Sequence, residues 1–163
     1  MRVGSRRLLG AAALTAAGTV VAVAAAALVT RDEAGVPAVV VADERGREVA
    51  SLPLPPSGRF ALQYRHSVYR AEVTETFAAQ DAGFRLVAVA SPSEAVLDYY
   101  ELEGRRVVDG GWRRLEPAAT EHLDALPLVA TELGRRTLVV GARRLPLFEP
   151  GRGPIHLVLT VRR

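Results

Sequence analysis

Cysteine is absent from the 163-residue chain. This absence excludes disulfide bonds, thiolate metal ligands and a lipid-attachment cysteine, so stability has to come from a packed core. Lysine is absent as well, because each of the 21 basic side chains is an arginine. Together with the many alanines and glycines, this usage indicates codon bias in a GC-rich genome rather than a chemical requirement.

Charge is missing between Arg7 and Arg31. Residues 8–29 are only Leu, Val, Ala, Gly and Thr, and as a helix they would span roughly 33 Å, enough to cross the hydrocarbon core of a membrane. Because no polar face interrupts this run, it does not fit a buried helix of a soluble domain. Residues 1–30 are therefore predicted to be an uncleaved signal anchor or, since residues 22–27 offer small-residue cleavage patterns, a cleaved signal peptide.

The charges that flank this run predict its orientation. Three arginines precede it, whereas residues 31–33 (Arg-Asp-Glu) carry no net positive charge. The positive-inside rule then places the N-terminus in the cytoplasm and residues 31–163 outside it. We expect a single-pass protein of the cell membrane with an extracytoplasmic domain, or a secreted protein if the signal is cleaved.

The formal net charge of +3 comes entirely from the N-terminal segment. Residues 31–163 hold all 18 acidic residues and the 18 arginines that remain after the first three. The high isoelectric point is therefore no evidence for nucleic-acid binding, and we expect no nucleic-acid partner.

The part after residue 30 has the pattern of an all-β domain. Short alternating or β-branched runs are separated by Gly and Pro, which predicts an antiparallel sandwich or barrel of eight to ten strands. Residues 116–126 are the only predicted helix, since Pro117 suits a first turn and Ala, Glu and Leu favour helix. The strands are expected at residues 36–42, 47–52, 60–69, 72–77, 83–91, 96–100, 105–108, around 112, 137–140, 143–148 and 155–161.

Residues 60–77 combine strand alternation with an unusual set of polar groups. A His, Arg or Glu placed among aromatic side chains costs desolvation unless it has a partner, so this stretch is either a satisfied polar core or a site. If it forms a hairpin that closes at Arg70 and Ala71, His66 lies opposite Glu75, and the carboxylate would hold the imidazole in one tautomer. A longer connection would change that register.

The spacing of the candidate residues gives little indication of a catalytic or a metal-binding site. His66 and Ser67 are adjacent, so in a strand they point to opposite faces, and no Gly-x-Ser-x-Gly motif is present. The three histidines are far apart, and we expect no metal and no cofactor. Glu72, Glu75 and Asp98 are expected to pair with Arg65 and Arg70. The arginine pairs at 105–106, 113–114, 135–136 and 143–144 fit either an anion-binding rim or solvated surface.

Two short motifs resemble a known family. They are His66-Ser67-Val68 followed by Val73-x-Glu75-x-Phe77, and, after a further strand, Val96-Leu97-Asp98-Tyr99-Tyr100. Over residues 60–104 the chain is similar to the bacterial family called domain of unknown function 1850. The resemblance implies a small exported or membrane-tethered protein, of a kind frequently encoded beside tripartite ATP-independent periplasmic (TRAP) transporters of the TAXI type. It implies no reaction, and the Gly-Ala-Gly segment that follows the second motif in many members is missing here.

These observations together predict an accessory β module that assists a TRAP-type solute transport system by binding a partner, such as a transporter subunit, or a small anion. An extracytoplasmic hydrolase that uses His66 and Glu75 is the alternative. No catalytic residue is assigned. The candidate binding residues are His66, Ser67, Arg65, Arg70, Glu75, Asp98 and Tyr99.

Overall fold

The computed structural model describes residues 35–163. Within this range the chain forms eleven strands and one short helix. In chain order these are β1 (Ala38–Asp43), β2 (Glu48–Pro53), β3 (Arg59–Arg65), β4 (Glu72–Gln80), β5 (Gly83–Ser91), α1 (Glu94–Tyr99), β6 (Gly104–Asp109), β7 (Trp112–Pro117), β8 (Ala125–Ala130), β9 (Thr137–Val140), β10 (Arg143–Pro146) and β11 (Ile155–Arg162). None of the described helices is long and apolar enough to span a membrane, and the predicted N-terminal helix lies outside the described residues.

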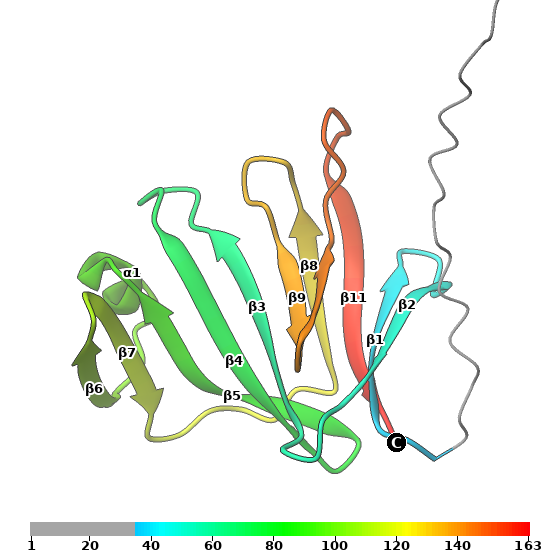
Figure 1. Cartoon of the computed structure of the whole chain (residues 1–163), viewed down its shortest axis with the longest axis horizontal. Coiled ribbons are helices and arrows are strands. Elements are labelled where there is room, and N and C mark those ends of the chain that lie inside the picture. Colours follow the sequence, from blue (N-terminus) through cyan, green and yellow to red (C-terminus); the bar gives the residue numbers. More distant parts are fainter. Residues whose placement is uncertain (1–34) are drawn as a thin grey trace, which may run out of the picture. The chain divides into compact units, whose positions relative to one another are not determined.

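The strands form two antiparallel sheets (Figure 1). The smaller sheet has the order β2-β1-β11-β8, and the larger has the order β10-β9-β3-β4-β5-β7-β6. The predicted all-β class is confirmed. Of the two predicted architectures, the closed barrel is wrong, because both sheets end in unpaired edge strands.

One hydrophobic core joins the two sheets. Val39 of β1 and Leu159 of β11 come from the smaller sheet, and three phenylalanines come from the larger sheet. The rings of Phe60 and Phe77 are stacked with centroids 5.2 Å apart, and Phe84 meets both edge-on at 5.3 and 5.5 Å. Offset and edge-to-face arrangements are the favourable geometries for aromatic pairs. Alternate residues of β3 and β4 thus face this core.

A second, smaller core lies under α1. Val96 and Leu97 of the helix are fully buried against Val73 of β4, Val89 of β5 and Leu115 of β7. A helix of six residues has little stability by itself, since most helical stability in proteins comes from packing an apolar face. The end of the larger sheet therefore holds α1 in place (Figure 1).

Helix and strand are exchanged relative to the sequence prediction at two places. The first is residues 96–100, which were expected to be extended and instead lie in α1 and at its end. Leu97 and Val96 are adjacent, and burying both together against one surface is possible on a helix but not on a strand, whose neighbouring side chains point to opposite faces.

The second exchange is residues 116–126, where the predicted helix is wrong. Residues 116 and 117 end β7, and Leu123 and Phe84 exchange two backbone hydrogen bonds of 2.8 and 3.0 Å. The contact needs Gly83, because a Cβ there would lie 2.4 Å from the carbonyl oxygen of Leu123. Pairing to β5 thus outweighs the local helix preference.

Strand β8 accounts for a further difference, because residues 35–163 form eleven strands and eight to ten were expected. Pro127 lies in the middle of β8 and weakens any strand prediction. The structure places β8 at the edge of the smaller sheet, paired on one side with β11. An edge strand tolerates proline because only one of its sides has to supply the ladder of hydrogen bonds.

Candidate functional site

The β3–β4 hairpin carries the first motif, but its register differs from the prediction. Arg65 pairs with Glu72, and Leu62 pairs with Glu75. The two strands are joined by residues 66–71, and the ends of this connection are fixed by backbone hydrogen bonds from His66 N–H to the Ala71 carbonyl and from Arg70 N–H to the His66 carbonyl. The predicted two-residue closure, and with it the His66–Glu75 pair, is wrong because the connection is longer.

His66 packs against two tyrosine rings, Tyr69 of this connection and Tyr99 of α1. Its ring centroid lies 5.1 Å from that of Tyr69 and 4.9 Å from that of Tyr99, and the two tyrosine rings are 6.4 Å apart. Nδ1 of His66 accepts hydrogen bonds from the backbone N–H groups of Val68 and Tyr69, at 3.3 and 3.4 Å. A neutral imidazole that accepts at Nδ1 carries its proton on Nε2. In this tautomer the Nδ1 lone pair is engaged by the backbone, and Nε2–H is available as a donor.

The residues around this buried ring are exposed. His66 itself is buried, whereas Val68 is 67%, Tyr69 43% and Tyr99 61% exposed. We call the surface of Val68, Tyr69 and Tyr99 the aromatic patch. Large apolar side chains that contact one another at the surface are characteristic of interaction sites, unlike scattered single ones. Aromatic side chains are also enriched at the centres of protein interfaces.

Glu75 belongs to a different cluster, on the inner side of the larger sheet. Its Oε1 accepts a hydrogen bond from the hydroxyl of Tyr64 at 3.0 Å and from that of Tyr100 at 2.5 Å. The two hydroxyls are 2.6 Å apart. The guanidinium carbon of Arg136 lies 4.7 Å from the centre of the Tyr64 ring. This phenol cluster, formed by Glu75, Tyr64 and Tyr100, is a satisfied polar core and holds no free carboxylate.

Both phenols stay protonated over a wide pH range. Burial raises the pKa of Tyr64 well above its ordinary value, and the Glu75 carboxylate raises it further. Burial and the same carboxylate also strongly raise the pKa of Tyr100. Removing a proton from either phenol would place a second negative charge beside Glu75 in a poorly solvated position. The phenols are therefore permanent donors to this carboxylate at neutral pH.

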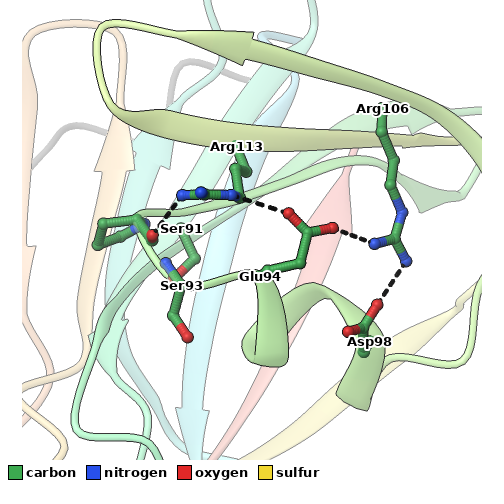
Figure 2. Close-up of polar contacts among 7 residues, drawn as sticks. Ser91, Ser93, Glu94, Asp98, Arg106 and Arg113 are labelled. Atoms are coloured by element: carbon green, nitrogen blue, oxygen red, sulfur yellow. Dashed lines mark hydrogen bonds and ion pairs between the residues drawn. The ribbon is translucent and has the colours of Figure 1, made fainter.

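Asp98 has a third role (Figure 2). It binds Nη2 of Arg106 on β6 at 2.8 Å, and the other Nη of Arg106 binds Glu94. Nε of Arg113 on β7 also contacts Glu94, at 2.8 Å, and its Nη1 donates to the Pro92 carbonyl at 2.9 Å. Figure 2 shows that these ion pairs join α1 to the β6–β7 hairpin. Asp98 thus positions the helix that carries Tyr99 and Tyr100.

A comparison with family models places the two motifs in one family. The model of the domain of unknown function DUF1850 matches residues 60–147, more than half of the chain. The chain belongs to the DUF1850 family. No curated protein matches, and no solved structure matches. The DUF1850 match extends the resemblance seen in the sequence from residue 104 to residue 147.

The other predicted residues of the DUF1850 motifs do not gather at one centre. Ser67 is exposed, and its side chain makes no hydrogen bond within residues 35–163. Nε of Arg65 donates to the Arg70 carbonyl at 3.0 Å. Neither arginine forms an ion pair with Glu72, Glu75 or Asp98 in the described part of the chain, so the predicted pairing is wrong. Of the candidate residues, the structure brings His66 together with Tyr99 and Arg65 together with Arg70.

Sequence reasoning did not identify four side chains that build this region. Tyr64 and Tyr100 bind Glu75, while Arg106 and Arg113 hold α1. With the correct register, the position of Tyr64 on the same face as Glu75 would have pointed to the first contact. No comparable signal exists for the two arginines, because their partners lie on a helix that was predicted as a strand.

The adjacent tyrosines at positions 99 and 100 provide a matched test of the phenol cluster. We expect Tyr100→Phe to lower the free energy of unfolding by about 1–3 kcal/mol, since it removes a hydrogen bond to a charged, half-buried carboxylate. Tyr99→Phe should change it by less than about 0.5 kcal/mol, because the Tyr99 hydroxyl makes no hydrogen bond within the described residues. Urea denaturation of the full-length variants measures both free energies of unfolding. Equal losses in the two variants would show that the phenol cluster adds nothing to the stability.

Proposed function

We propose that this protein is an exported, membrane-tethered accessory β module that binds a subunit of a TRAP-type solute transporter through the aromatic patch. The observation that carries the proposal is the exposure of Val68, Tyr69 and Tyr99 around a buried histidine. Family membership supports the choice of partner, because the resemblance implies a protein of a kind frequently encoded beside such transporters. The apolar N-terminal run supports a position at the membrane.

The surroundings of the patch suggest the chemistry of the partner surface. Arg70 is exposed next to Tyr69, and its guanidinium has no carboxylate partner among residues 35–163. Its backbone φ is +54°, in the left-handed region that costs free energy for a residue other than glycine. Residues in this conformation are held by the surrounding structure and cluster at ligand clamps and other functional sites. We infer a partner surface with an apolar pocket for the tyrosines and an acidic group beside it.

The alternative hydrolase receives no support from the geometry. A His66–Glu75 acid–base pair requires hydrogen-bond distance between the two side chains. His66 instead uses Nδ1 to accept backbone N–H groups, and Glu75 binds two phenols. These contacts therefore favour binding through the aromatic patch over hydrolysis by a His66–Glu75 pair.

The test is co-purification of the tagged, full-length protein with co-expressed transporter subunits from detergent-solubilised membranes. We expect Val68→Asp and Tyr99→Ala each to reduce the retained transporter at least about tenfold, as for central residues of an interface. Val108→Asp is the matched control, because Val108 on β6 is 70% exposed, nearly the same as Val68, and lies outside the patch. Retention that falls equally in Val68→Asp and Val108→Asp, or a wild type that retains no subunit, would refute the proposal.

A further inference from the structure

A hollow on the outer face of the larger sheet, away from the aromatic patch, collects arginines. It has a volume of about 290 Å³ and is lined by Arg59 of β3, Arg85 of β5 and Arg114 of β7, with residues 116–120 as one wall. Ligand-binding pockets for small molecules start near this volume. Any ligand of the hollow therefore has to be small.

Strand register explains why the arginines converge. Arg59 and Arg85 both pair with Ala78 of β4, which lies between them. Residues paired directly across neighbouring strands share one face of the sheet, and two strand spacings place these Cα atoms about 10 Å apart. The side chain of Ala78 is a single methyl group. Two long arginine side chains thus flank a low point of the sheet surface.

The positive charges of Arg59 and Arg85 are not neutralised by a carboxylate of the described residues. Glu116 is the one acidic residue that lines the hollow, and it is already bound by Arg105 at 2.5 and 2.9 Å and by Arg114. Hydrogen bonding to Arg105 lowers the pKa of Glu116, so it stays ionised and engaged. The side chains of Arg59 and Arg85 have no acceptor within residues 35–163. The lining residues carry three positive charges and one negative charge.

The wall of the hollow contains backbone N–H groups without an acceptor in the described residues. The backbone N–H groups of Ala119 and Thr120 donate to no acceptor in the described part of the chain, whereas that of Ala118 binds the Glu103 carbonyl. The Thr120 hydroxyl holds this wall against β5 by donating to the Leu86 carbonyl at 2.8 Å. Unpaired backbone N–H groups beside arginines are a common arrangement in anion sites.

We propose that this hollow binds a small multivalent oxyanion, with Arg59 and Arg85 as its principal ligands. The arginine fork matches the geometry of phosphate and carboxylate groups. The site is independent of the proposed partner surface, because none of its lining residues belongs to the β3–β4 connection or to α1.

The experiment is isothermal titration calorimetry of the full-length protein in detergent at constant ionic strength. One arm uses pyrophosphate and the other citrate, which separates phosphate from carboxylate recognition. We expect saturable binding with one site per chain in at least one arm. Arg59→Gln and Arg85→Gln should each weaken it about tenfold, the effect of losing a charge-assisted hydrogen bond.

Arg143→Gln is the matched control. Arg143 is an exposed arginine on β10 of the same sheet and also has no acceptor within residues 35–163, so its variant should bind like the wild type. A rise in the melting temperature with added anion, lost in Arg85→Gln, gives a second readout. Non-saturable binding in both arms, or an equal loss in Arg143→Gln, would overturn the proposal. The Val68→Asp variant should keep full anion binding, so failure of the two proposals can be distinguished.

Discussion

Raising the pH above 10 is expected to destabilise the folded domain by about 2.7 kcal/mol per pH unit, half of it from Tyr64 and half from Tyr100. An unfolded tyrosine ionises near pH 10.0, whereas the folded pKa of both residues is raised. Above pH 10 the folded state therefore binds more protons than the unfolded state. The stability that the two phenols contribute is fully present below pH 10 and is lost as the pH rises.

The composition of the chain makes this measurement unusually clean. Without lysine or cysteine, the only side chains with ordinary pKa values between about 8 and 11 are the four tyrosines. Urea denaturation at a series of pH values gives the slope. Tyr100→Phe should halve it, and Tyr99→Phe should keep the wild-type slope. A wild type whose stability is constant from pH 9 to about 11.5 would show that Glu75 and the phenols do not interact as described.

Leu97→Ala is expected to lower the free energy of unfolding by about 2–5 kcal/mol. Leu97 is completely buried and, with Val96, fixes α1 on the larger sheet. The loss is large compared with the typical 5–15 kcal/mol total stability of a domain. Because α1 carries Tyr99 and Tyr100, the same change should loosen both the aromatic patch and the phenol cluster.

Leu133→Ala is the control for this change. Leu133 is 55% exposed, so its truncation should alter the free energy of unfolding by less than about 0.5 kcal/mol. Chemical denaturation measures stability, and co-purification with the proposed transporter partner reports the state of the patch. A Leu97→Ala loss below about 1 kcal/mol would mean that the smaller core contributes little and that the ion pairs alone hold α1.

The spacing of the DUF1850 motifs has a structural explanation. The two tyrosines after Asp98 divide between the two parts of the first motif, because Tyr99 packs on His66 and Tyr100 binds Glu75. Asp98 fixes the helix through Arg106. The second motif therefore supplies one contact to each part of the first motif, Tyr99 to His66 and Tyr100 to Glu75.

Much of the architecture could be predicted because β-strand alternation is a local property of the sequence. Strands β5 and β9 were predicted at their observed bounds, and β11 was predicted to within one residue. Local preference was insufficient at residues 96–100 and 116–126, since these short segments take their conformation from the surface they pack against. At residues 116–126, the two backbone hydrogen bonds between Phe84 and Leu123 outweigh the local helix preference.

The sequence by itself determined the all-β class, the family and the absence of thiol and lysine chemistry, because each depends only on composition, local alternation or short motifs. Only the tertiary structure decided that His66 meets Tyr99, that Glu75 meets Tyr64 and Tyr100, and that Arg59 lies across from Arg85. The physical reason is register. A six-residue connection in place of a two-residue turn moves every cross-strand partner, and His66 in that connection packs against Tyr99 of a helix distant in the chain.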